Sequence, residues 1–265
     1  MKKFFVSYAS LVLAFMYLPI LVLIIFSFNR SKISANWEGF TFEWYTKLFQ
    51  DSYVIDAAIN SIIIAIVTTV ITVILGTLCA LALYKYRFKW QGMIEGTIYL
   101  PILIPDILMG LSLLILFSQL HFRLNHVTII ISHVTFSISY VVVILLARLK
   151  VMGLELEQAS SDLGATPWQT FRYITLPLMA PGMIAAALLT FTLSIDDFVI
   201  SFFVSGPAST TLPLYIYGLV KKGVSPEINA LSTLLIVVIV GLMLLSELLN
   251  SKGINGKKGK GSLPF

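Results

Sequence analysis

The chain of 265 residues is 58% hydrophobic and only 12% charged, and its mean hydropathy is +0.93. A soluble domain is typically about a quarter charged, so this shortage of polar surface indicates that lipid surrounds much of the chain. The formal net charge of +5 does not indicate nucleic-acid binding, because the basic residues stand between hydrophobic runs and would orient the chain in a membrane. The one cysteine, Cys79, excludes a disulfide within the chain.

Six apolar segments are each near or above the ~20 residues that a helix needs to cross a bilayer core. In chain order they cover about 4–28, 57–84, 93–118, 127–147, 179–204 and 230–249. We therefore predict an all-α membrane protein whose six transmembrane helices occupy residues 1–250. Residues 251–265 are rich in glycine and lysine and are predicted to form a basic, flexible cytoplasmic tail.

The distribution of lysine and arginine predicts the orientation. The two tails and the second and fourth connections carry 12 of these residues, whereas the remaining connections carry 6. Because positive charge is retained on the cytoplasmic side, both termini are predicted to be cytoplasmic.

Motifs of enzymes are missing from the sequence. There is no GxxxxGK(S/T) phosphate loop, so ATP is not bound by that route. His121, His126 and His133 are separated by apolar sequence and do not have metal-ligand spacing. One of them could relay protons, but a structural, hydrogen-bonded histidine is the more common case. We predict a protein that is not an enzyme and that contains no metal site.

The third apolar segment is interrupted by Pro101 and Pro105, beside Asp106. Proline removes a helical hydrogen bond and clashes with the preceding turn, so a kink or a break is expected here. A broken helix with free carbonyl groups and an acid suits a cation site near a transport path. A kink that serves packing alone is the alternative, but it would not explain Asp106.

The long connection at residues 149–182 is predicted to form two short helices around a tight corner. The first would run from about Leu154 to Leu163 and end at Gly164, which is suited to the left-handed conformation. Thr166 would cap the second, with Pro167 at its first position. An apolar side of the first helix is formed by Leu154, Leu156, Ala159 and Leu163. This side could pack on the membrane domain or dock a cytoplasmic protein, and physical arguments leave both open.

The connection resembles the EAA loop of ABC importer permeases. That loop has the pattern E-A-A, three residues, G, nine residues, I-x-L-P, and we align Gln158 with its middle alanine. The residues that carry the resemblance are Glu157, Ala159, Gly164, Ile174, Leu176 and Pro177. The resemblance implies a type I importer permease fold in which these residues couple the membrane helices to an ATPase.

The same resemblance implies partners and a location. The chain would pair with a homologous second permease subunit, with a dimer of cytoplasmic ATPase subunits and with an extracytoplasmic binding protein, in the lipid bilayer of the bacterial inner membrane. ATP and magnesium would be bound by the ATPase, so that this chain itself would hold no cofactor.

Two adjacent carboxylates, Asp196 and Asp197, stand in the apolar stretch LTFTLSIDDFVISFF at residues 189–203. Two central aspartates cost about 5–7 kcal/mol on insertion, against about 5 kcal/mol gained from the apolar residues of the span. Reading 183–203 as one helix, we expect one acid to face the path and the other an interface. Ser194 shares the face of Asp197.

The alternative to a transport role is a structural carboxylate pair bonded to the backbone or to a neighbouring base. No Lys or Arg of this chain lies at a matching depth, so we expect any cationic partner to come from elsewhere.

The acids are predicted to lie on a path for a cationic substrate. At ~1.5 Å per residue from the cytoplasmic end, Asp196 falls in the outer half of the bilayer. Trp44, at the outer interface, could hold an ammonium group against its ring. The predicted substrate-path residues are Asp106, Asp196, Asp197, Ser194 and Trp44.

Several segments also resemble the permease subunits of spermidine/putrescine importers. They are FTLSIDDFVISFFVSGP (191–207), LIPDILMGLSLLILF (103–117), SHVTFSISYVVV (132–143) and GVSPEINALST (223–233). The resemblance implies import of polyamines.

Three alternative functions remain. In the first, the chain is an ABC permease that transports another cation or an organic solute. Another is a proton-coupled secondary transporter, which would have no use for an ATPase-docking loop. A third is a non-transporting scaffold, for which the intramembrane acids would be unexplained.

Overall fold

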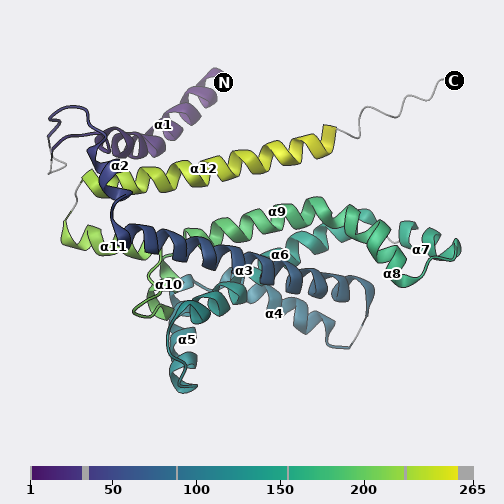
Figure 1. Ribbon diagram of the computed structural model, residues 1–265. Coiled ribbons are helices and arrows are strands. Elements are labelled where there is room, and N and C mark those ends of the chain that lie inside the picture. The colour runs from purple at the N-terminus through teal and green to yellow at the C-terminus, as the bar shows by residue number, and fades with distance from the viewer. Residues whose placement is uncertain (1, 32–35, 88, 154, 224–225, 256–265) are drawn as a thin grey trace. The chain divides into compact units, whose positions relative to one another are not determined.

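The computed structural model describes residues 2–31, 36–87, 89–153, 155–223 and 226–255, and these are mainly helical (Figure 1). Within this part of the chain, the one β-bridge joins Asn29 and Phe40. The helices are α1 (Lys2–Phe26), α2 (Glu43–Leu48), α3 (Ser52–Lys85), α4 (Gln91–Leu103), α5 (Asp106–Gln119), α6 (His126–Met152), α7 (Glu155–Asp162), α8 (Pro167–Thr170), the π-helical turn η1 (Phe171–Thr175), α9 (Leu176–Ile195), α10 (Val199–Val204), α11 (Leu212–Lys222) and α12 (Pro226–Asn255).

The described helices confirm an all-α membrane protein and contain four candidate membrane spans, or five. Four are single helical runs: α1, α3, α6 and the continuous run Pro167–Ile195. The fifth is the pair α4 and α5, whose axes are bent by 108° at a short break. The described apolar part of α12, Pro226–Gly241, is shorter than a full span.

The chain divides into two compact units. The first comprises residues 1–59 and 212–241, and its core is formed by Trp44, Leu48, Val54, Ala230 and Leu231. In this unit the Tyr215 hydroxyl donates a hydrogen bond to Asp51 Oδ2 at 3.1 Å. Burial, together with this hydrogen bond to Asp51, raises the pKa of Tyr215 to about 12. The phenol therefore stays protonated at physiological pH and remains a hydrogen-bond donor to Asp51, which links α11 to the start of α3.

The second unit, residues 60–211 with 242–265, contains the candidate functional residues except Trp44. Here α6 and α9 lie side by side, with a buried core between them that includes Leu145 and Met179 (Figure 1). At Gly76 of α3, an added Cβ would lie 2.6 Å from Val141 of α6. Glycine at this position therefore allows α3 to approach α6 closely.

A second core in this unit joins α5 to α10 and α6. Gly110 of α5 stands against α10, where a Cβ would lie 2.7 Å from the Phe203 ring. Buried partners around this contact include Ile200, Leu113 and Phe136. The helix that begins at Asp106 is therefore packed directly on the short helix that follows the aspartate pair.

The fifth apolar segment is not one helix, and the prediction of an uninterrupted span across 183–203 was wrong. Helix α9 ends at Ile195, with Asp196 as its C-cap, and α10 begins at Val199. Both aspartates therefore lie in a break between two helices. The hydropathy pattern did not show this break, because the residues on both sides of it are equally apolar.

The C-terminal helix α12 continues to Asn255 and so includes residues 251–255, which the sequence analysis assigned to a flexible tail. Residues 256–265 of that tail lie outside the described residues.

Candidate substrate path and coupling loop

The break predicted in the third apolar segment is confirmed. Pro101 lies within α4, which ends at Leu103. Ile104 and Pro105 are extended, with ψ of 131° and 137°. For Ile104 the cause is the proline that follows it, since a residue before proline is disfavoured in the helical region. Asp106 then opens α5 as an exposed side chain in its first turn, where a negative charge is favoured by the helix dipole.

Asp197 is held by a buried network with His133 of α6. Its Oδ2 lies 3.1 Å from His133 Nε2, and the histidine is completely buried. The other ring nitrogen, Nδ1, lies 2.7 Å from Ser194 Oγ, while Ser201 Oγ lies 3.2 Å from Nε2. Both nitrogens of the ring are thus engaged by residues on either side of the helix break.

The same carboxylate also caps α10. The backbone N–H of Ser201 donates to Asp197 Oδ2 at 2.8 Å, and that of Ile200 donates to Oδ1 at 3.3 Å. The first turn of a helix leaves such N–H groups without partners, so an aspartate placed there stabilises the start of the helix. Asp197 therefore links α6 to α10 through His133 and also stabilises the first turn of α10.

The expectation that a cationic partner comes from elsewhere concerned lysine and arginine, whereas the partner that Asp197 contacts is a histidine. The partner, His133, belongs to this chain but lies on another helix. Ser194 and Asp197 were expected to share a face of one helix; Asp197 instead lies beyond the end of α9, and both side chains contact the imidazole of His133.

Asp196 differs from its neighbour in exposure. Its side chain is exposed, whereas that of Asp197 is 8% exposed. Among the described residues, the Asp196 carboxylate forms no ion pair. Of the two adjacent acids, Asp196 is thus the one that is open to a ligand.

Trp44 belongs to the first unit, whereas the three aspartates belong to the second. Trp44 is only 8% exposed. Its indole N–H donates to the carbonyl of Asn29 at 2.8 Å, and Lys47 Nζ lies 4.8 Å from the ring centroid. A ring that packs against Leu48 and Val54 and already faces a lysine has little surface left for a substrate ammonium. This environment favours a packing role for Trp44.

The corner of the long connection has the predicted local structure. Helix α7 begins at Glu155, and the predicted start at Leu154 lies outside the described residues. Gly164 follows with φ of +82°, a conformation that L side chains rarely adopt. Thr166 caps α8 and forms a reciprocal capping box with Gln169. The hydrogen bonds of the cap, together with this glycine, fix the turn between the two helices.

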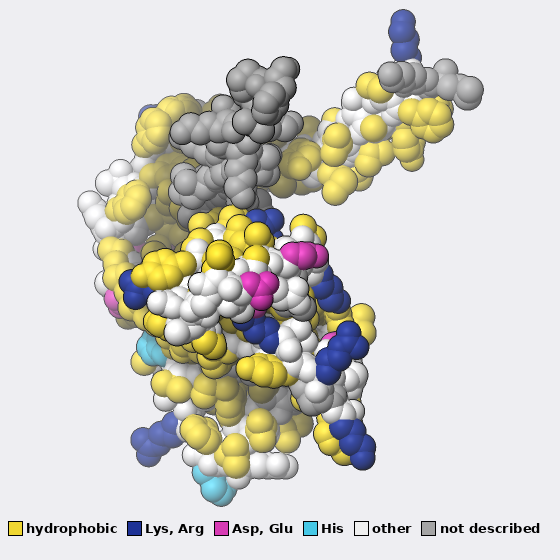
Figure 2. All heavy atoms as spheres, turned by 90° about the vertical axis from the view of Figure 1, so that its right-hand side faces the viewer, with side chains coloured by type: hydrophobic (Ala, Val, Ile, Leu, Met, Phe, Trp, Pro, Cys, Tyr) yellow, Lys and Arg dark blue, Asp and Glu magenta, His cyan; other side chains and the backbone are white. Residues whose placement is uncertain are grey.

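Apolar side chains remain exposed around this corner. Leu163 is 89% exposed and Trp168 is 65% exposed, while Leu156 of α7 is also open to solvent. Figure 2 views the molecule from the end where α7 and α8 lie in Figure 1 and shows hydrophobic side chains among acidic and basic ones. The described residues of the second unit therefore do not cover Leu156 and Leu163, two residues of the apolar side that the sequence indicates.

Glu157 anchors the loop to two neighbouring elements. Its Oε2 lies 2.8 Å from Lys85 Nζ at the end of α3, and its Oε1 accepts a 2.6 Å hydrogen bond from Thr175 Oγ1 in η1. Ser160 of α7 also contacts Thr170 of α8, with 2.8 Å between the two hydroxyl oxygens. The start of α9 is thereby tied to α7 and α3.

The alignment of the motif on Glu157 was wrong by one residue. Counting back from Gly164, the three spacer residues and E-A-A place the glutamate position at Gln158, with Ala159 as the middle alanine and Ser160 as the last. Glu157 stands just before the pattern, and its ion pair with Lys85 gives it a role of its own. The spacing from Gly164 to Ile174, Leu176 and Pro177 is unaffected.

More than half of the chain matches a known family of transport proteins. Residues 72–251 match the family described as the inner membrane component of binding-protein-dependent transport systems. The chain belongs to this family. Its helical fold is also similar to that of a crystallised bacterial ABC transporter involved in the import of the acidic polysaccharide alginate, with a TM-score of 0.73 and 18% identity over 95% of this chain and 96% of that one.

Two curated relatives of the permease are named for polyamines. The spermidine/putrescine transport system permease protein PotC of Escherichia coli K12 is 40% identical over 253 residues, which is 96% of each chain. The putrescine transport system permease protein PotI of the same strain is 42% identical over 229 residues, covering 84% of this chain and 82% of PotI. The permease is therefore a multi-pass inner-membrane component of an ABC transporter and is not itself catalytic.

Two residues of the permease that organise these regions were missed by sequence reasoning. His133 was weighed only as an isolated histidine, and Lys85 only as a topology signal. Each acquires its role from a partner more than 60 positions away in the chain, at Asp197 and Glu157 respectively. No local pattern links such pairs, but an apolar helix that contains a histidine is a signal that a buried partner exists.

Proposed function

We propose that this permease carries polyamines such as spermidine and putrescine into the cytoplasm, driven by ATP hydrolysis in partner subunits. The observation that carries the proposal is the relationship to PotC, which extends over 96% of the chain. An exposed aspartate at a helix break supports it, because a polyamine offers several ammonium groups to be stabilised away from bulk water.

Asp196 is the residue that we assign to the polyamine path, with Asp106 as a second acid on the neighbouring packed helix. Both carboxylates are exposed, and each stands at a break in an apolar segment. Asp197 and Ser194, in contrast, are occupied by His133 and hold the break in shape. A carboxylate that is open and not paired keeps its charge available to the substrate.

The proposal includes six spans with both termini in the cytoplasm. In this arrangement α4 and α5 form one broken third span, α9 and α10 form a broken fifth span, and α12 is the sixth. The excess of lysine and arginine in the two tails and in the second and fourth connections supports this orientation.

The corner formed by α7, Gly164 and α8 is the segment that we propose docks an ATPase subunit. The motif residues that follow the corner are Ile174, Leu176 and Pro177, with Ala159 before it. ATP-dependent closure of the ATPase dimer would move this segment, and the contacts of Glu157 with Lys85 and Thr175 would carry the movement to α3 and α9. A homologous second permease and an extracytoplasmic binding protein complete the proposed complex.

ATP hydrolysis by the reconstituted complex tests the proposed function. With binding protein on the outside, spermidine or putrescine should stimulate hydrolysis, and a protonophore should leave both hydrolysis and uptake unchanged. Uptake that follows an imposed proton gradient without ATP would contradict an ABC mechanism. Stimulation by another solute, with none by either polyamine, would contradict the proposed substrate class.

The Gly164 corner gives a prediction about coupling. Gly164→Val should insert normally but lose most of the co-purifying ATPase, because a β-branched residue is strongly disfavoured at φ of +82°. No neighbouring atom lies within 4 Å of the Cβ position, so backbone strain rather than a clash is the cause. Gly164→Asn is the matched control, since asparagine tolerates this conformation and should retain the ATPase. Equal loss in both variants would contradict the conformational explanation.

The ion pair between Lys85 and Glu157 gives a second prediction. Glu157→Gln and Lys85→Met should each uncouple ATP hydrolysis from uptake, with a several-fold fall in transported substrate per ATP. Because one partly buried ion pair is worth about 1 kcal/mol, the complex should still assemble. The exchanged double variant Glu157→Lys with Lys85→Glu should recover part of the coupling. If the double variant is no better than the single ones, the pair does not transmit movement.

A further inference from the structure

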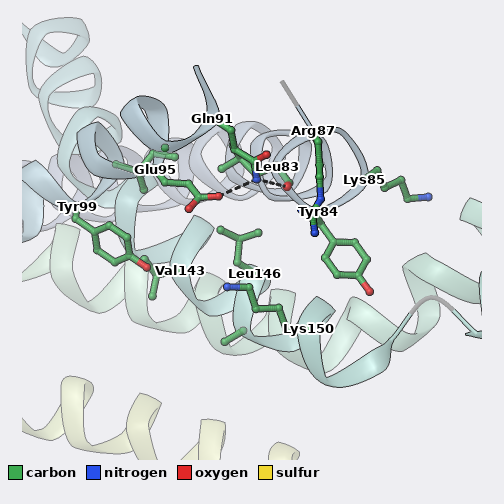
Figure 3. A pocket seen from close by; sticks show the side chains of 13 residues that line it. Leu83, Tyr84, Lys85, Arg87, Gln91, Glu95, Tyr99, Val143, Leu146 and Lys150 are labelled. Atoms are coloured by element: carbon green, nitrogen blue, oxygen red, sulfur yellow. Dashed lines mark hydrogen bonds between the residues drawn. The ribbon is translucent and has the colours of Figure 1, made fainter. Parts of the chain in front are cut away.

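A pocket of about 800 Å³ lies where the end of α3, the start of α4 and the end of α6 meet, all within the second unit. Figure 3 shows Glu95 of α4 and Lys150 of α6 turned toward the same space, while Arg87 lies beyond Gln91, next to Tyr84. The amide nitrogen of Gln91 donates to Glu95 Oε1 at 2.9 Å and to the carbonyl of Leu83 at 3.1 Å. The carboxylate is therefore positioned by the pocket's own hydrogen bonds.

The charges in this pocket are of both signs and are not neutralised by each other. Among the described residues, Arg87, Lys150 and Glu95 take part in no ion pair. Lys85, which also borders the pocket, is instead paired with Glu157 of the coupling loop and points away from Glu95 (Figure 3). The pocket thus offers two cationic groups, one carboxylate and the hydroxyl groups of two tyrosines, Tyr84 and Tyr99.

The surroundings of the pocket indicate the surface of a membrane. Helix α4 buries none of its residues, and Met93 on it is 62% exposed. Tyr86 and Trp90, in the connection before α4, are also exposed, as aromatic residues at a membrane interface are. Apolar residues such as Ile98 and Leu146 line the pocket together with the charged groups. The pocket therefore offers charged groups and apolar side chains together, as the boundary between headgroups and acyl chains does.

We propose that this pocket binds the headgroup of an ethanolamine phospholipid of the cytoplasmic leaflet. Arg87 and Lys150 bind its phosphate, and Glu95 accepts hydrogen bonds from its primary ammonium group. Its acyl chains lie along the exposed apolar side of α4. A glycerol headgroup has the same phosphate but offers Glu95 only neutral hydroxyl groups, whereas ethanolamine offers an ammonium group, so the carboxylate favours the ethanolamine lipid. The proposal depends on the orientation of the chain and not on the identity of the transported substrate.

Native mass spectrometry of the whole importer complex tests this site. The complex is released from nanodiscs that contain equal amounts of phosphatidylethanolamine and phosphatidylglycerol, and the retained lipids are counted. Wild type should retain phosphatidylethanolamine in preference. Arg87→Gln and Lys150→Gln should each lower the retained amount about fivefold, the effect of one cation near a lipid surface. Lys89→Gln, the same charge change in the same connection but outside the pocket lining, should retain the wild-type amount.

Glu95→Gln separates amine recognition from phosphate recognition. Its amide oxygen can still accept from Gln91, and the variant should bind both lipids equally instead of preferring phosphatidylethanolamine. The mass of the intact complex, measured in the same spectrum, shows that each variant assembles. Wild-type preference in Glu95→Gln, or unchanged retention in a double Arg87→Gln and Lys150→Gln variant, would overturn the proposal. Displacement of the lipid by millimolar inorganic phosphate would instead assign the pocket to a soluble phosphate and would overturn it as well.

Discussion

Asp196→Asn is expected to lower spermidine uptake by about 10- to 150-fold, while the amount of assembled complex stays at the wild-type level. The loss corresponds to one charge-assisted hydrogen bond to a desolvated ammonium, worth roughly 1.5–3 kcal/mol. Asparagine has nearly the same shape and is cheaper than aspartate in lipid, so insertion should not suffer. The exposed position of Asp196, without an ion pair to a described residue, is what makes this residue rather than Asp197 the expected substrate contact.

The matched control for this change is Asp196→Glu, which keeps the charge and should retain much more uptake than Asp196→Asn. Asp106→Asn should also lower uptake, because Asp106 is the second exposed acid of the proposed path. Normal uptake by the double asparagine variant of Asp196 and Asp106, at a normal amount of complex, would remove both residues from the substrate path.

His133→Ala is expected to lower the thermal denaturation midpoint of the purified complex by at least ~4 °C. The change leaves the buried Ser194 hydroxyl and the Asp197 carboxylate without their imidazole partner, at about 1–3 kcal/mol for each group. In a chain of this size 1 kcal/mol corresponds to about 2–4 °C. Asp197→Asn should be milder, because its one amide oxygen, placed as Oδ2, can still accept from the N–H of Ser201, and only the longer hydrogen bond from Ile200 is lost.

His126→Ala is the control for this prediction, since His126 is only partly buried and its ring contacts the side chain of Asn60 at 2.9 Å. Its midpoint should stay within about 2 °C of wild type. A His133→Ala complex that denatures at the wild-type temperature but has lost uptake would contradict the structural role. It would indicate instead that His133 acts directly on the substrate or on a proton.

The coupling loop shows what local sequence can predict. Gly164, Thr166 and Pro167 determine their own backbone conformation through φ freedom, side-chain capping and a fixed ring. Their positions therefore predicted the corner, and the structure has it at the same residues. The break before Asp106 was predictable for the same reason, because two prolines act on the turn that precedes them.

The aspartate pair shows where such reasoning ends. The break at Asp196 contains neither proline nor glycine, and it is stabilised by contacts with His133 on another helix. Hydropathy treats this segment as a single span, and no single-sequence pattern pairs residues 64 positions apart. The same holds for Lys85 and Glu157, whose ion pair depends on how α3 approaches the loop. Tertiary contacts, and not local propensity, decide which acid is free.

Accumulation of radiolabelled spermidine in proteoliposomes tests the central claim most directly. The vesicles contain this permease with its partner permease and ATPase, enclose ATP on the cytoplasmic face of the complex, and receive loaded binding protein on the other face. We predict accumulation that requires ATP, is competed by excess putrescine, and falls at least tenfold in Asp196→Asn at equal complex content. Accumulation that is independent of ATP, or identical in wild type and Asp196→Asn, would contradict the account.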